Sequence, residues 1–206
     1  MPHLRLIGAS GWLAAVLIAA GCQSTAVTSA KLYMQEGQPE RAKEQLLAAV
    51  ESEPQNPEVH FLLGKVYADE QDWSVMAASF DRSLALGPKF AEDIARIRGH
   101  FWAQRYNAGI ENATATEPDY AAAMAAFSDA TTIDPDKVAA WRNLGFTHYQ
   151  LGNADKAIDA YQKAVAVAPQ DTLALSSLAT MSVQEGRYEA AAQTLTDLLE
   201  LKPSDA

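Results

Sequence analysis

The sequence predicts an all-α protein built from a repeated pair of helices. Its 206 residues are 49% hydrophobic, which is enough to bury a substantial core. Segments rich in Ala, Gln and Glu, with few consecutive β-branched residues, favour helix over strand. Prolines, which cannot continue a helix, recur at one constant interval that is lengthened only once. These prolines are Pro54, Pro88, Pro135, Pro169 and Pro203, and the longer interval separates Pro88 from Pro135.

The stretch from Trp141 to Pro169 defines the repeat. Bulky residues fill the space between two helices, small residues let the backbones approach, and Gly152 permits a tight turn between them. This spacing resembles the tetratricopeptide repeat (TPR), a unit of two antiparallel helices that is roughly 34 residues long. The residues that carry the resemblance are Trp141, Leu144, Gly145, Ala157, Tyr161 and Pro169.

The same spacing divides the rest of the chain into about five units. Small residues of the second helix, such as Ala42, Ala123 and Ala191, recur in phase with the prolines. Pro39 suits the first turn of a helix, and Gln71 replaces the turn glycine in the second unit. The resemblance therefore implies a TPR α-solenoid. Its units, numbered one to five, are residues 23–56, 57–90, 91–137, 138–171 and 172–205.

Residues 1–21 do not follow the repeat. Arg5 precedes an apolar run over residues 6–21, which is shorter than the roughly 20 residues that a membrane-spanning helix needs. A short basic start followed by such a run is typical of a secretory signal peptide. We therefore expect residues 1–21 to be removed from the mature protein.

The apolar run ends in Ala19-Ala20-Gly21, followed by the chain's only cysteine, Cys22. This ending resembles the lipobox of bacterial lipoproteins, although Ala19 stands where Leu is usual. The resemblance implies that Cys22 is lipidated and becomes the N-terminus; the alternative is ordinary signal cleavage that leaves a free thiol. Gln23 stands where an Asp retains many lipoproteins in the inner membrane, so we expect the periplasmic side of the outer membrane.

Unit three is longer than the others by roughly 13 residues, or about 3.6 turns of helix. Apolar residues at helical spacing predict one continuous helix from about residue 91 to residue 112, with a break near Gly99 as the alternative. We expect the insertion to be a structural spacer. The alternative is a docking element, because arginines beside aromatic residues are enriched at binding hot spots. The candidate docking residues are Arg96, Arg98, Trp102 and Arg105.

Composition and motifs argue against several functions. The chain has 26 acidic and 16 basic residues, for a net charge of −10, and is poorly suited to the phosphate backbone of nucleic acids. The histidines His60, His100 and His148 lie outside any metal-binding spacing, and no nucleophile motif or phosphate-binding loop is present. His148 stands where the repeat usually carries Tyr, which indicates packing. We expect no enzymatic activity, no metal and no cofactor.

The TPR resemblance implies a concave groove lined by the first helix of each unit. Its apolar and aromatic side chains, with a few cations, suit an extended or helical peptide. For each residue the alternative is a solvated helix face. Some TPR proteins hold a peptide C-terminus with a carboxylate clamp, but Phe146 and Thr180 stand where that clamp needs Asn. The expected groove residues are Lys31, Met34, Phe61, Lys65, Arg142, Phe146, Tyr149, Thr180 and Val183.

The last unit offers a second surface. We expect no polar capping helix after it, although repeat proteins usually need one for solubility. Several leucines would then face an absent neighbour, and an exposed apolar patch usually marks an interface. These are Leu195, Leu198, Leu199 and Leu201. The alternative function is therefore a structural subunit that forms a homo-oligomer through this repeat.

Together these features predict a non-catalytic, lipid-anchored adaptor of the bacterial cell envelope. Its groove would bind a peptide segment or a subunit of an envelope complex, and lipid on Cys22 would attach it to the membrane. TPR lipoproteins of similar build serve outer-membrane protein insertion, pilus secretin assembly and murein-enzyme regulation. The resemblance does not select among these systems.

Overall fold

The computed structural model describes residues 24–201, which contain ten α-helices, one 3₁₀ helix and no strand. The predicted all-α class is therefore confirmed. The predicted signal peptide, Cys22 and Pro203 lie outside the described residues. The helices are α1 (Thr25–Gln35), α2 (Pro39–Ser52), α3 (Pro57–Asp69), α4 (Trp73–Leu86), η1 (Pro88–Phe90), α5 (Ala91–Thr114), α6 (Tyr120–Ile133), α7 (Val138–Gln150), α8 (Ala154–Val167), α9 (Thr172–Gln184) and α10 (Tyr188–Leu201).

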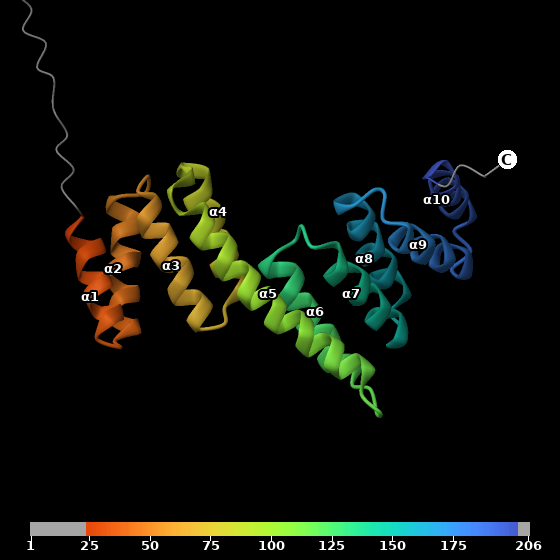
Figure 1. Ribbon diagram of the computed structural model, residues 1–206, viewed down its shortest axis with the longest axis horizontal. Coiled ribbons are helices and arrows are strands. Elements are labelled where there is room, and N and C mark those ends of the chain that lie inside the picture. Colours follow the sequence, from red (N-terminus) through yellow and green to blue (C-terminus); the bar gives the residue numbers. More distant parts are fainter. Residues whose placement is uncertain (1–23, 202–206) are drawn as a thin grey trace, which may run out of the picture.

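The α-helices pack as five consecutive pairs, from α1 with α2 to α9 with α10. Figure 1 shows these pairs following one another along the long axis of the molecule. Pro54, Pro135 and Pro169 lie in the links between pairs, and Pro88 begins η1. Because each pair packs mainly on its neighbours in sequence, the fold is an α-solenoid.

A residue with positive φ turns the chain between the helices of four pairs. In the second pair this residue is Gln71, with φ of 60°, a left-handed conformation that costs a non-glycine residue about 1 kcal/mol. Its N–H donates to the Ala68 carbonyl at 3.1 Å, just as the Gly152 N–H donates to the Tyr149 carbonyl at 2.9 Å. The turn therefore keeps its hydrogen bonding without glycine. The other three turns use Gly37, Gly152 and Gly186.

In three pairs, an aromatic ring of the second helix packs directly on a glycine of the first. A Cβ built on any of these glycines would approach the ring to between 2.5 and 2.9 Å, closer than real contacts allow. Only glycine therefore lets the two helices approach this closely. The contacts are Gly64 with Phe80, Gly109 with Phe127 and Gly145 with Tyr161.

Gly109, which the sequence analysis did not assign, sets the register of the long unit. In the other two pairs, the glycine and the aromatic residue that packs on it are equally far apart in the sequence. Gly109 and Phe127 are two residues farther apart than that. Two of the inserted residues therefore lie in the link before α6, and the rest extend the start of α5. This helix has 24 residues and passes Gly99 without a break, which confirms the predicted continuous helix.

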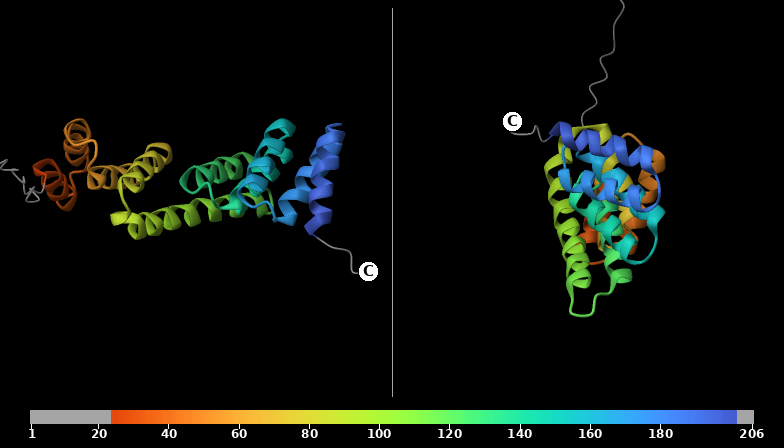
Figure 2. Two further views of the ribbon diagram at one scale, coloured as in Figure 1. Left: turned by 90° about the horizontal axis from the view of Figure 1, so that it is seen from above. Right: turned by 90° about the vertical axis from the view of Figure 1, so that its right-hand side faces the viewer.

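The added start of α5 packs back on the second pair. Ile94 is 1% exposed and joins the core of the first two pairs, and the Phe101 ring lies 5.2 Å from that of Trp73. Arg98 donates to Asp81 Oδ1 at 2.8 Å and to a main-chain carbonyl of α4 at 3.1 Å. The rest of α5 pairs with α6, so one long helix joins the second pair to the third (Figure 2).

Replacing Gly109 with alanine should destabilise the protein by about 2 kcal/mol, because Phe127 is 1% exposed and cannot move away from the new Cβ. Gly99 is the matched control in the same helix, since a Cβ there meets nothing within 4 Å. Gly99→Ala should stabilise the protein by about 0.5 to 1 kcal/mol through helix propensity. Urea denaturation followed by circular dichroism measures both changes. Similar effects of the two substitutions would contradict the close contact.

Candidate interaction groove

Two aromatic side chains of α7 and one face of α9 line an open hollow of 350 Å³. Phe146 and Tyr149 are 39% and 43% exposed, and Thr180 of α9 lines the same hollow. The structure thus brings these three predicted groove residues together. The lining consists of Phe146, Tyr149, Tyr161, Ser176, Ser177, Thr180, Met181 and Gln184.

The buried members of this lining form a firm floor. Tyr161 lies on Gly145, where the contact between the paired helices is closest. Burial raises the pKa of the Tyr161 hydroxyl and outweighs the opposite effect of its hydrogen bond with Ser177, so the phenol is uncharged at neutral pH. At the rim, the Phe146 ring meets the ring of Tyr120 edge to face at 5.9 Å. Tyr120 begins α6 and is not among the groove residues expected from the sequence.

Hydroxyl groups of the lining are arranged to accept hydrogen bonds from a ligand. Ser176 Oγ donates to the Thr172 carbonyl at 2.6 Å, and Thr180 Oγ1 donates to the Ser176 carbonyl at 2.8 Å. Each hydroxyl thus uses its only hydrogen and keeps lone pairs for a donor. The lining contains no carboxylate, amine, imidazole or thiol, the groups that most often perform acid–base or covalent catalysis. It suits an apolar side chain flanked by N–H groups.

Arg142 does not line the hollow but joins α7 to the start of α9. Its Nη1 donates to Asp171 Oδ2 at 3.0 Å and to Oδ1 at 3.2 Å. Asp171 also caps α9 by accepting from the main-chain N–H groups of Leu173 and Ala174. The Arg142 side chain therefore orients the two helices that form the hollow.

Val183 belongs to a neighbouring hollow of 530 Å³ between α9 and α10. The two hollows share Ser176, Thr180 and Gln184. Apolar side chains dominate this second hollow, whose lining is Ser176, Ala179, Thr180, Val183, Gln184, Leu195 and Leu198.

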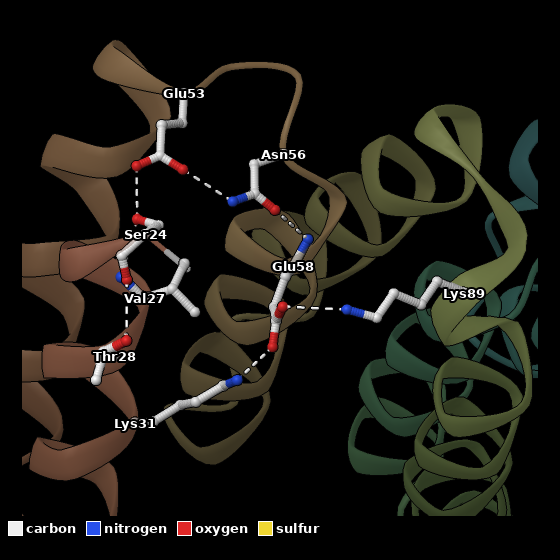
Figure 3. Close-up of polar contacts among 8 residues, drawn as sticks. All are labelled: Ser24, Val27, Thr28, Lys31, Glu53, Asn56, Glu58 and Lys89. Carbon is white, nitrogen blue, oxygen red and sulfur yellow. Dashed lines mark hydrogen bonds and ion pairs between the residues drawn. The ribbon is translucent and has the colours of Figure 1, made fainter. Parts of the chain in front are cut away.

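At the other end of the array, Glu58 of α3 links two lysines (Figure 3). Its carboxylate accepts from Lys31 of α1 and, at 3.2 Å, from Lys89 of η1. Burial by itself raises the pKa of Glu58, but the two lysines outweigh this effect and hold the pKa below its usual value. Lys31, a predicted groove residue, thus joins the first pair of helices to the second.

The other predicted groove residues of units one and two lie against the core. The Phe61 ring is 9% exposed and stacks on Phe90, with 4.4 Å between ring centroids. Lys65 Nζ lies 5.9 Å from the Phe61 centroid, and Met34 is half-buried against the core of the first two pairs. Little of the Phe61 ring therefore faces an open groove.

The residues proposed for docking in the insertion are mostly engaged within the fold. Arg98 binds α4, as described above, and Arg105 Nη2 lies 2.9 Å from Asp129 Oδ2 of α6. Trp102 is half-buried and stacks on Tyr106 at 4.7 Å. Arg96 is exposed and pairs with the neighbouring Asp93. This arrangement favours the spacer interpretation over docking.

His148 takes part in packing on the other side of α7. Burial lowers its pKa and the nearby Lys156 adds to the effect, so the imidazole is neutral at physiological pH. Over residues 24–201, no set of His, Cys, Asp or Glu side chains is grouped to hold a metal ion. None of the helices in that range has the length and apolar character to cross a membrane.

Three tetratricopeptide repeat families match the chain. The matches cover residues 27–89, 110–179 and 174–206. They reach from α1 into the residues beyond α10, with a gap that contains most of the added start of α5.

Comparison with individual proteins gives distant similarities. Superkiller protein 3 of Schizosaccharomyces pombe is 25% identical over 165 residues, which make up 80% of this chain and 11% of that protein. The chain therefore spans 11% of the length of this relative. MamA from Desulfovibrio magneticus is 22% identical, with coverage of 88% of this chain and 98% of that chain and a TM-score of 0.40. For pilF of Pseudomonas aeruginosa the identity is 19%, the coverages 87% and 76%, and the TM-score 0.37.

Proposed function

Because the chain belongs to the tetratricopeptide repeat family, whose members are generally non-catalytic interaction modules, we propose that it is an adaptor that binds a protein segment between α7 and α9. The observation that carries this proposal is the pair of exposed rings, Phe146 and Tyr149, beside hydroxyl groups free to accept hydrogen bonds. Exposed apolar side chains that lie together, unlike single ones, are typical of binding surfaces, and aromatic residues are enriched there.

The chemistry of the hollow indicates the kind of segment that it takes. An apolar side chain of the ligand would displace water from the exposed faces of Phe146 and Tyr149. Main-chain N–H groups beside it would donate to Ser176 and Thr180, as those of an extended peptide or of the first turn of a helical one can. Because the lining is uncharged, a charged side chain would lose hydration without gaining a partner there. The ligand segment is therefore apolar at its centre.

Replacing Phe146 and Tyr149 together with alanine should weaken capture of the partner from cell extracts roughly thirtyfold, the loss of about 2 kcal/mol typical of an aromatic hot spot. Val167→Ala is the matched control, since Val167 is 37% exposed at the end of α8 and lines neither hollow. Affinity capture with quantitative mass spectrometry compares the three proteins. A partner that remains bound to the double variant does not use this hollow.

We also propose that Cys22 carries a lipid that attaches the adaptor to the cell envelope. The support is the sequence: an apolar leader of the length of a signal peptide, small residues before the cysteine and no second cysteine in the chain. An attached adaptor would hold its partner at the membrane, on the periplasmic side of the outer membrane. Several acyl chains together would make the attachment stable, because each buried methylene contributes about 0.8 kcal/mol.

Mass spectrometry of protein from its native membranes should reveal a mature chain that begins at Cys22 and carries the added mass of acyl groups. Cys22→Ser should remove that mass and release the protein from the membrane fraction. The Phe146 and Tyr149 variant is the control, because it should keep its lipid. A mature chain with an unmodified thiol would exclude the anchor but not the adaptor role.

A second candidate function is self-association through the face that α9 and α10 share. Leu195 is 44% exposed and Leu199 is 71% exposed next to the larger hollow. In the preceding unit, the equivalent of Leu195 is Tyr161, which packs on Leu178 and Met181 of the following first helix. The exposed face of unit five thus carries apolar side chains at positions that, in unit four, pack against the first helix of the next unit.

If this face joins two copies, Leu199→Glu should raise the dimer dissociation constant at least about tenfold, because a buried carboxylate would lack a partner. Leu151→Glu is the control, since Leu151 is 39% exposed in the link between α7 and α8. Analytical sedimentation at several protein concentrations measures the dissociation constant of both variants and of the unchanged protein. A monomer at every concentration, in the unchanged protein as in the variants, would exclude self-association.

A further inference from the structure

A cluster of three lysines lies where the first two pairs of helices and η1 meet. Lys31 and Lys89 both donate to the carboxylate of Glu58, which is 19% exposed (Figure 3). We define the lysine cluster as Lys31, Lys65 and Lys89.

Two aromatic rings connect the third lysine to the other two. Lys89 Nζ lies 4.8 Å from the centroid of the Phe90 ring, and Phe90 stacks on Phe61 with 5° between the ring planes. On Phe61, Lys65 Nζ lies 5.9 Å from the centroid. Attraction between an ammonium and a ring face holds each long side chain over the stack. The positions of these lysines are therefore restricted before any ligand arrives.

The cluster carries more positive charge than Glu58 can neutralise. One carboxylate serves both Lys31 and Lys89, and each ammonium has three donors. Their side chains are 36% and 64% exposed, so donors remain accessible. Lys65 makes no ion pair with any residue that the structure describes. Asp69 follows Lys65 closely in the sequence, and Glu92 follows Lys89. Within residues 24–201, neither carboxylate forms an ion pair with a lysine of the cluster.

We propose that the lysine cluster is a binding site for an acidic segment of a partner protein. Excess positive charge at one place, on a chain with a net charge of −10, gives an acidic ligand a specific position instead of a general attraction. A nucleic acid fits less well, because its long run of phosphates would extend past the three lysines over a chain whose net charge is −10. A short acidic segment brings only a few charges, which three lysines can meet.

The geometry indicates the spacing of carboxylates in the ligand. Glu58, where Lys31 and Lys89 meet, and Lys65 lie two turns apart on α3, about 10 Å along the helix axis. A polyproline II segment rises about 3.1 Å per residue and has three residues per turn, so carboxylates at every third position lie on one side and reach both ends of the cluster. The cluster involves α1, α3 and η1 and shares no residue with the hollow between α7 and α9. The two sites are therefore independent.

Fluorescence anisotropy with a labelled hexaglutamate peptide and the full-length protein tests this site. Binding should be detectable at an ionic strength of about 0.1 M and should weaken strongly at about 1 M, where charges are screened within a few ångströms. Replacing all three lysines with glutamine should weaken binding about tenfold or more. Hexaglutamine, which has the same length without charge, should not bind.

The matched control replaces Lys137, Lys156 and Lys163 with glutamine, which changes the net charge equally but lies on or beside α7 and α8. If the triple variant of the cluster unfolds, Lys65→Gln alone keeps the test valid, because Lys65 forms no ion pair within residues 24–201 and its loss should still weaken binding measurably. The Phe146 and Tyr149 variant should bind hexaglutamate unchanged. Equal weakening by the control triple, binding of hexaglutamine, or tighter binding of an oligothymidylate would overturn the proposal.

Discussion

The contact between an aromatic ring and a helix glycine determines the geometry of the three central pairs of this array. Where Phe80, Phe127 and Tyr161 each lie on a glycine, no space remains even for a methyl group. In these three pairs the distance between the two helices is therefore fixed by ring thickness rather than by longer, more adaptable side chains. In the fourth pair the same contact has a functional consequence, because Tyr161 is also the floor of the candidate groove. The packing of the pair thus sets the depth of the site.

Polar contacts between successive units orient one pair relative to the next. Arg142 reaches Asp171 at the start of α9, and Lys31 reaches Glu58 near the start of α3. In both cases the first helix of one unit holds the beginning of the next first helix. Partly exposed ion pairs contribute no more than about 1 kcal/mol each, so apolar packing supplies most of the stability. These pairs therefore act mainly on direction: Arg142 and Lys31, both at groove positions, each bind the next unit of the array.

The sequence predicted those features that depend on steric demands within one unit. A left-handed turn, a glycine beneath a ring and a proline between pairs each leave little choice of residue, so Gly145, Tyr161 and Pro169 revealed the architecture. The same register placed Phe146 and Tyr149 among the expected groove residues, and both line the hollow.

Other roles depend on neighbours that the register of one unit cannot reveal. Phe61 is covered by Phe90 of η1, and Arg142 pairs with Asp171, which caps the first helix of the next unit. Gly109 was missed because the longer link that follows α5 shifts it out of phase with Phe127.

The long helix α5 connects two parts of the array. Its added turns bury Ile94 in the core of the first two pairs, while Gly109 lies beneath Phe127 of α6. One continuous helix thus belongs to two cores, and bending at that junction would have to break its backbone hydrogen bonds or expose apolar side chains. The insertion therefore fixes the distance between the charged surface of the first two pairs and the uncharged hollow of the last two.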